Sequence, residues 1–236
     1  MKAAHTPFTP VDFAKVSVAA LLAVLAWDAS GLDLALASWF GTPTGFPLVH
    51  NWWLQNVLHN GLRQAGWALF AVLVVMVWWP LGPLQQISLR SRVGLVLGVA
   101  LAALAVQLIK RASGTSCPWD LASFGGTASY VSHWQWGVRD GGGGHCFPAG
   151  HASTGFAFLS GWFWLRRSAP KAAMAWLVCA LVLGFGLGLV QQMRGAHYLS
   201  HTLWTAWLCW SVSGAVWWVA RRWAEQAPQL NRPALG

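Results

Sequence analysis

Apolar residues along the chain gather in six runs that polar segments separate. The runs lie near residues 13–29, 65–81, 93–109, 152–165, 172–190 and 203–220. Most of them are close to the ~20 residues that a helix needs to cross the hydrocarbon core of a bilayer. The pattern therefore predicts an all-α, polytopic membrane protein built as a bundle of six transmembrane helices.

The fourth run, at 152–165, is the shortest and carries Ser153, Thr154 and Ser160 among its apolar residues. Polar groups at membrane depth need partners inside the protein, which neighbouring helices can supply. A second interpretation therefore stays open for this run, namely a buried helix that the other helices surround.

The first run also has some features of a cleavable signal peptide, because Lys2 and Lys15 precede its apolar part and Ala35-Leu36-Ala37 offers a weak cleavage site. The run ends at Asp28, however, well before that site. We therefore favour an uncleaved first helix.

The composition agrees with a membrane protein. Hydrophobic residues make up 56% of the chain and charged residues 9%, whereas a soluble domain has roughly 25% charged residues. No internal repeat is evident, and we expect one membrane-embedded domain over residues 1–236. The segment after Arg222 contains Pro228 and Pro233 and is predicted to be a short disordered tail.

Most of the 15 lysine and arginine residues fall on one side of a six-helix arrangement. They are Lys2, Lys15, Arg90, Arg92, Arg166, Arg167, Lys171, Arg221, Arg222 and Arg232. Short cytoplasmic loops collect such residues, so this side is predicted to be cytoplasmic and to hold both termini. The protein would then be a multi-pass protein of the bacterial inner (cytoplasmic) membrane. The same loops explain most of the net charge of +9 without a nucleic-acid partner.

The opposite, periplasmic side collects nearly all the other titratable groups. The cations there are Arg63, Lys110, Arg111, Arg139 and Arg194, and the histidines are His50, His59, His133, His145, His151, His197 and His201. Histidine and clustered cations are the groups that a reaction at neutral pH would use, so the active site is predicted to face the periplasm.

Residues 28–64, between the first two runs, are rich in aromatic residues such as Trp39, Phe40, Trp52 and Trp53. Aromatic rings are favoured at the headgroup level of a membrane. The segment is therefore either a re-entrant or surface helix that guides a lipid headgroup, or a plain aromatic belt, and the sequence leaves both open.

The longest outer loop, residues 111–150, contains several glycines, including the run 141–144. Glycines let backbone N–H groups surround an anion, although such a run is more often a flexible linker. Cys117 and Cys146 also lie in this loop, and an oxidising periplasm lets them form a disulfide. A zinc site of Cys117, Cys146 and His145 is the competing hypothesis, but it lacks a paired CxxC spacing. Cys179 and Cys209 fall inside apolar runs and are expected to be core residues.

Three polar patches lie at the edges of apolar runs. They are Lys110-Arg111 with Cys117-Pro118, Pro148-Ala149-Gly150-His151, and Arg194-Gly195-Ala196-His197 followed by Tyr198-Leu199-Ser200. Cations, two histidines and glycine-rich backbone on one membrane surface suit a dianionic phosphate group. In order and type, the patches resemble the three signatures of the type-2 phosphatidic acid phosphatase superfamily, which are membrane lipid phosphate phosphatases related to vanadium haloperoxidases.

This resemblance implies a two-step phosphoryl transfer. His197 would attack phosphorus and form a phosphohistidine, His151 would protonate the departing oxygen, and water would then hydrolyse the intermediate. Lys110, further cations and the backbone at Ala149 and Gly150 would hold the phosphate oxygens. Neither a metal nor another cofactor is therefore expected.

Four positions depart from the family pattern. Cys117 and Gln191 stand where the family has arginine, Ala149 replaces a serine, and His201 replaces the aspartate that orients the nucleophile. The candidates to restore the missing positive charge are Arg111, Arg139 and Arg194, since a guanidinium can bind phosphate through two N–H groups.

Arg194 and His201 have a further geometric argument. Arg194 lies three residues before His197, and His201 lies four residues after it. If the last helix begins near Arg194, all three side chains share one helix face. His201 is then expected to fix the tautomer of His197.

The favoured function is hydrolysis of a phosphate monoester or diphosphate on a membrane lipid, with the lipid and the bilayer as the partners. An isoprenoid diphosphate, a phosphatidylglycerol phosphate or lipid A are possible substrates. One alternative is a lipid-to-lipid phosphotransferase that uses the same phosphohistidine. The other is a non-catalytic relative that binds anionic lipid headgroups, against which His151 and His197 argue.

Overall fold

The computed structural model describes residues 8–230 of the chain, with side chains up to residue 226. This part is helical, and its only β-structure consists of two isolated bridges, Thr42 with Gly45 and Leu121 with Ala128. The predicted all-α class is therefore confirmed. Lys2, Arg232 and Pro233, on which predictions from the sequence rest, lie outside the described residues.

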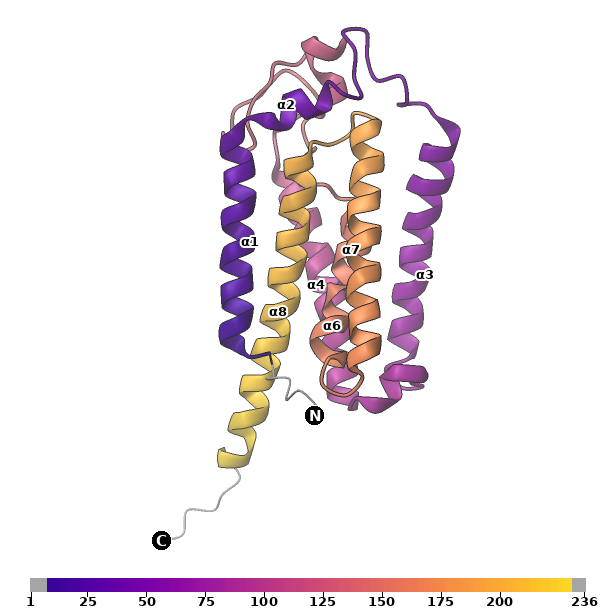
Figure 1. The fold of residues 1–236 in the computed structure, drawn as a ribbon, viewed down its shortest axis with the longest axis vertical. Helices are drawn as coiled ribbons and strands as arrows, with labels where there is room; N and C mark the ends of the chain where they lie inside the picture. Colours follow the sequence, from indigo (N-terminus) through magenta and orange to yellow (C-terminus); the bar gives the residue numbers. More distant parts are fainter. Residues whose placement is uncertain (1–7, 231–236) are drawn as a thin grey trace, which may run out of the picture.

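The long helices run side by side in a bundle (Figure 1). They are α1 (Pro10–Ser30), α3 (Leu62–Val75), α4 (Leu89–Ala112), α7 (Pro170–Met193) and α8 (Leu199–Leu230). A broken helix lies among them and consists of α5 (Ser153–Phe156), η5 (Ala157–Leu159) and α6 (Ser160–Leu165). Each predicted apolar run thus contains helical residues.

Three helices of the described part are long and apolar enough to cross a membrane, as judged by length and composition. They are α1, α4 and α7. The protein is therefore membrane-associated, and the full count of six membrane spans remains a prediction.

The two ends of the bundle carry different structures. The start of α1, the last turns of α8 and the turn between α6 and α7 lie at one end, whereas α2 (Leu32–Ala37) lies across the other (Figure 1). The loop that connects α4 to α5 also lies at the end with α2. We call this end the outer end.

The main hydrophobic core lies between α4, the broken helix, α7 and α8. Its most buried members include Leu95, Val106, Phe156, Leu159 and Leu165. α8 occupies the centre of the bundle and contacts α1, α4, α6 and α7. Burial of these side chains fixes the positions of the helix ends that carry the predicted site.

The broken helix is buried, as the second interpretation of residues 152–165 proposed. Gly155 lies so close to α7 that a Cβ at this position would meet the backbone of Gly184. The hydroxyl of Ser160 donates a hydrogen bond to the carbonyl oxygen of Leu95 on α4, at 2.9 Å. Small residues and a partnered hydroxyl thus allow a short helix to sit at the centre of an apolar bundle.

α1 is an integral part of the bundle. The indole N–H groups of Trp207 and Trp210 on α8 each donate to Ser17 at 3.0 Å, one to its carbonyl oxygen and one to its hydroxyl. At the outer end, the Asp28 carboxylate accepts hydrogen bonds from Trp204 at 2.8 Å and Trp134 at 3.1 Å. These contacts hold α1 against α8 and against the outer loop.

The segment after α2 leads to a π-helix, η1 (Trp53–Gly61), which continues directly into α3. Trp52 and Trp53 project from its start with 60% and 66% of their surfaces exposed. A wide helical turn of this kind is rare and is frequently found at functional sites.

The prediction of a disordered tail after Arg222 is wrong up to residue 230. α8 continues to Leu230 through Pro228. Arg221 and Glu225, one turn apart, form an ion pair with 3.2 Å between Nη2 and Oε1. The residues that follow Arg222 include Trp223 and Ala224, which extend the helix before the proline is reached.

A second, smaller hydrophobic cluster covers the outer end. Phe46, Leu121, Phe124 and Tyr198 pack there and hold the outer loop against the turn between α7 and α8. Gly195 in that turn has a positive φ of 75°, and a Cβ at this position would meet the ring of Phe46. Glycine is therefore required at this turn.

Candidate active site

A cavity of about 770 Å³ opens between α3 and α4 near the outer end. Its polar lining includes His59, Arg63, Gln107, Lys110, Arg111, His151, Ser153, Thr154, Gln191, Arg194 and His197. Its apolar lining includes Trp67, Phe70, Val99, Leu104 and Phe158. Among the described residues that line the cavity, none is acidic, so its polar part is strongly positive.

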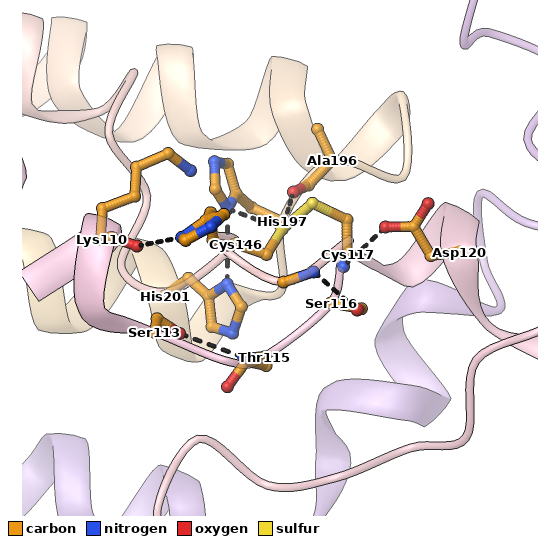
Figure 2. Close-up of a disulfide and its surroundings, with 12 residues drawn as sticks. Lys110, Ser113, Thr115, Ser116, Cys117, Asp120, Cys146, Ala196, His197 and His201 are labelled. Carbon is orange, nitrogen blue, oxygen red and sulfur yellow. Dashed lines mark hydrogen bonds between the residues drawn. A yellow bond between two sulfur atoms is a disulfide. The ribbon is translucent and has the colours of Figure 1, made fainter. Parts of the chain in front are cut away.

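His197 lies in the turn between α7 and α8. Its Nδ1 atom is 3.4 Å from Nδ1 of His201, which leaves Nε2 as the ring nitrogen without a protein partner among the described residues. Figure 2 shows the Lys110 side chain pointing toward this ring. Burial, followed by the charge of Lys110, holds the pKa of His197 well below its usual range. The ring is therefore neutral at neutral pH, and Nε2 has the lone pair in the tautomer in which Nδ1 donates to His201.

His151 lies just before α5 and faces the π-helix η1. Its ring stacks on the ring of His59, with 3.8 Å between centroids and 6° between planes. Its Nε2 donates a hydrogen bond to the backbone carbonyl oxygen of His59 at 2.8 Å. Because a carbonyl only accepts, Nε2 carries a proton, and in the neutral ring Nδ1 carries none. Burial, followed by His59, lowers the pKa of His151 to about 4, so the neutral ring predominates near pH 7.

Lys110, in the last turn of α4, passes close to Gly150. A Cβ at Gly150 would lie 3.1 Å from Cδ of Lys110 and 3.3 Å from Nε2 of Gln107. Glycine thus leaves room for the lysine side chain. The neighbouring Ala149 is fully buried, and its backbone N–H donates to the carbonyl oxygen of His201 at 3.2 Å. That N–H is engaged within the protein, and Ala149 does not line the cavity, whereas Gly150 does.

The three arginines predicted to replace the family's cations occupy different places. Arg111 and Arg194 line the cavity, whereas Arg139 is exposed on the outer loop and does not line it. Arg194 is buried, and its Nε donates to the carbonyl oxygen of Val49 at 3.3 Å. Its position is therefore fixed by the segment between α2 and η1.

The expectation that the last helix begins near Arg194 is wrong. α7 ends at Met193 and α8 begins at Leu199, because the chain turns at Gly195 between them. Arg194 and His197 therefore reach the cavity from a turn and do not share a helix face. His201, in the first turn of α8, still contacts His197 as expected.

The start of α8 is held by a residue that the sequence did not point to. The Asp33 carboxylate on α2 accepts a hydrogen bond from the backbone N–H of Ser200 at 3.1 Å, and one from the Trp27 indole at 2.8 Å. An acidic group at the N-terminus of a helix satisfies a free N–H and stabilises the helix. Asp33 thereby fixes the turn that carries His197.

Several polar residues of the cavity were not predicted to bind the substrate, among them Gln191, His59 and Arg63. Gln191 is buried; its Oε1 lies 3.4 Å from Nη1 of Arg194, and its Nε2 has no partner among the described residues. This amide can therefore donate to a ligand in the cavity. His59 and Arg63 come from η1 and the first turn of α3, and the only sequence signal for them was their place on the outer side.

The glycine run of the outer loop does not line the cavity. The backbone N–H of Gly142 donates to the Asp140 carboxylate at 3.0 Å, and that of Gly144 donates to the Ser116 hydroxyl at 3.1 Å. Ser116 in turn donates to Asp140 through both its backbone N–H and its hydroxyl, at 2.7 Å each. These N–H groups therefore hold the loop together and are not free to bind an anion.

Cys117 and Cys146 are joined by a disulfide, with 5.2 Å between their Cα atoms. The Cys146 sulfur lies 3.6 Å from Nδ1 of His197, so the bond ties the outer loop directly behind His197 (Figure 2). Ligand atoms of Cys146, His197 and His201 all lie within 4.8 Å of one another. Because both sulfurs are bonded to each other, they offer no thiolate to zinc, and the hypothesis of a Cys/His zinc site loses its ligands.

Residues 92–225 match the family model of the PAP2 superfamily, and comparisons with curated proteins and with solved structures gave no match. The matched segment contains Lys110, His151 and His197, which the fold brings to one cavity. PAP2 members are phosphatases, so the match supports hydrolysis of a phosphoric ester in general. With more than half of its residues in the matched segment and all three polar patches inside it, the chain belongs to the PAP2 superfamily.

Proposed function

We propose that the protein hydrolyses a phosphate monoester or diphosphate on a membrane lipid, without a metal, through a phosphohistidine on His197. The observation that carries this proposal is the lining of the cavity between α3 and α4. One part is cationic and holds His197 and His151, while another part is apolar and includes Trp67, Phe70 and Val99. A lipid phosphate has the same two parts, an anionic head and a hydrocarbon chain.

In the first step, His197 Nε2 attacks phosphorus, and the N–P bond forms as the P–O bond to the leaving group breaks. Lys110 lies beside the ring that attacks. Arg111, Arg194 and the amide of Gln191 line the same cavity and bind the non-bridging oxygens. Fixed donors at these oxygens stabilise the charge that the transition state spreads over them.

In the second step, water attacks the phosphohistidine and the P–N bond breaks, which releases phosphate and restores His197. Nδ1 of neutral His151 accepts the proton from the attacking water. In its protonated form, the same nitrogen donates a proton to the leaving oxygen of a monoester in the first step. His201 holds Nδ1 of His197 throughout and thereby directs Nε2 toward phosphorus.

The reaction is proposed to take place at the periplasmic face of the bacterial inner membrane. The outer end holds the cavity and the disulfide, and a disulfide persists in an oxidising compartment. The described cations at the other end, such as Arg90, Arg166 and Arg221, follow the bias of cytoplasmic loops.

Release of inorganic phosphate from short-chain phosphatidic acid by the purified protein in detergent micelles tests the proposal. We expect turnover by the wild type, in buffer with a chelator as well, and near-complete loss in His197→Ala and His151→Ala. His50→Ala is the matched control, because His50 is an exposed histidine that does not line the cavity. Size-exclusion profiles establish that each variant is folded.

The outcomes also separate the alternatives. If the phosphate appears on a second lipid in mixed micelles and no inorganic phosphate is released into the water, the protein is a phosphotransferase. Binding of the lipid phosphate without turnover of any kind would indicate a non-catalytic relative. Loss of activity with the chelator and recovery with zinc would contradict the metal-independent mechanism.

A further inference from the structure

The helix formed by η1 and α3 brings two polar residues to the cavity, and both precede the family-matched segment, which begins at residue 92. We propose that these residues, His59 and Arg63, form a subsite for a second phosphate group, so that the preferred substrate is a lipid diphosphate that loses its terminal phosphate. This inference rests on the proposed function, because it takes His197 as the nucleophile.

His59 and Arg63 are placed where the leaving group must lie. They are four residues apart on one continuous helix and both line the cavity, so their side chains project from the same side. His59 stacks directly on His151, which stands at the leaving oxygen in the proposed mechanism. Lys110, in contrast, lies beside the ring of His197.

Arg63 is available to bind an anion. The described ion pairs are His133 with Asp28 and Arg221 with Glu225, so Arg63 has no acidic partner among the described residues. Burial is the main cause of the low pKa of both His59 and His151, and the positive charges of Arg63 and Arg194 contribute to it. Arg63 lines the same cavity as these two histidines.

The hydrogen bond from His151 to the His59 carbonyl oxygen indicates which kind of leaving group the site can release. An alcohol leaves readily only if a proton reaches its oxygen, yet the proton of neutral His151 is held on Nε2 by the His59 carbonyl. A phosphate leaves without a proton, because its other oxygens share the negative charge. It needs a cation nearby instead, and Arg63 supplies one.

A lipid diphosphate would react in two steps. His197 Nε2 forms a bond to the terminal phosphorus, and the bond between that phosphorus and the bridging oxygen breaks. The electron pair remains on the bridging oxygen, so the lipid monophosphate leaves as an anion beside Arg63. Water then hydrolyses the phosphohistidine, its proton passes to Nδ1 of His151, and inorganic phosphate is released.

Farnesyl monophosphate and farnesyl diphosphate, which carry the same hydrocarbon chain, test the inference with the purified protein at pH 7. We expect kcat/KM for the diphosphate to exceed that for the monophosphate by about tenfold or more, with farnesyl monophosphate as the accumulating product. Arg63→Ala should lower kcat/KM for the diphosphate about tenfold and leave that for the monophosphate within about twofold. Arg63→Lys should recover part of the loss, since it keeps the charge.

Arg139→Ala is the control, because Arg139 is an outer-side arginine that does not line the cavity. Equal turnover of the two substrates by the wild type, or an equal loss for both in Arg63→Ala, would overturn the subsite and leave the proposed function standing. If the wild type releases phosphate from neither farnesyl substrate nor phosphatidic acid, both proposals are wrong. Arg63 is exposed, so its replacement does not disturb the core.

Discussion

The imidazoles of His197 and His201 face each other with 3.4 Å between their Nδ1 atoms. His201 occupies the position at which the family pattern has an aspartate. Like that aspartate, a neutral imidazole can fix the tautomer of its neighbour, but it brings no negative charge to stabilise an imidazolium. His197, the proposed nucleophile, is thus oriented by a neighbour that does not make it more basic.

Substitution of His201 separates orientation from charge. His201→Ala should lower kcat by about 100-fold or more, because His197 loses the group that orients it. His201→Asp should keep substantial activity and raise the pKa of His197, since a carboxylate stabilises the protonated ring. The acid limb of the kcat/KM profile should therefore move to higher pH in His201→Asp. An unchanged limb, or full activity in His201→Ala, would show that His201 does not orient the nucleophile.

The pH profile of the wild type should reflect the buried histidines. A protonated His197 cannot attack phosphorus, and burial lowers its pKa below the ordinary value of 6.5. As pH falls, kcat/KM for a lipid diphosphate, whose leaving group needs no proton from His151, should therefore hold through pH 6.5 and decline only below it. A terminal phosphate titrates near pH ~6, so its ionisation is measured separately by ³¹P NMR and corrected for. A decline centred at or above 6.5 would contradict a desolvated, neutral His197.

The sequence predicted the parts of the site that lie within short motifs. Lys110, His151 and His197 lie at the edges of apolar runs, and helix ends in a bundle place such edges at one surface. The cavity indeed joins them. The contact between His197 and His201 was also predicted from their spacing. Residues four positions apart are neighbours on a helix, and α8 begins only two residues after His197.

The remaining features depend on contacts between distant segments, which no local pattern encodes. The stacking of His59 on His151 joins residues that are 92 positions apart. Arg194 is fixed by the carbonyl of Val49, and the ring of Phe46 fills the space beside Gly195, which leaves room for glycine alone at this turn. In the glycine run, the N–H groups of Gly142 and Gly144 donate to Asp140 and Ser116, which lie outside the run.

The disulfide should contribute strongly to stability. It closes a loop between residues 29 positions apart, and a loop of this size stabilises the folded state by about 3–4 kcal/mol through the entropy of the unfolded chain. Cys117→Ser with Cys146→Ser should lower the midpoint of thermal unfolding in detergent and reduce turnover, because Cys146 lies behind His197. Cys179→Ser, at an exposed free cysteine, is the control. An unchanged midpoint in the double variant would argue against this role.

Topology can be tested with single cysteines in a variant that lacks the native four. A cysteine at Arg139 on the outer loop should react with a membrane-impermeant maleimide in intact cells whose outer membrane has been permeabilised. A cysteine at Arg167, in the turn between α6 and α7, should react only after lysis. Those two positions lie at opposite ends of the bundle. The reverse pattern of labelling would place the cavity on the cytoplasmic side.

We expect Arg194 and Gln191 together to take the place of the family's third-motif arginine. Gln191 would stand at the family position and Arg194 would supply the positive charge, with 3.4 Å between its Nη1 and Oε1 of Gln191. Arg194→Lys keeps a charge but loses the planar set of donors and the hydrogen bond to Val49, so kcat should fall about 100-fold. Gln191→Ala removes one neutral donor and leaves the bond to Val49, so its loss should be closer to tenfold. The rates of phosphate release by Arg194→Lys, Gln191→Ala and Arg111→Ala, measured under the same conditions, test this prediction. If Arg194→Ala retains near-normal kcat while Arg111→Ala does not, the cation that replaces the missing arginine comes from the end of α4.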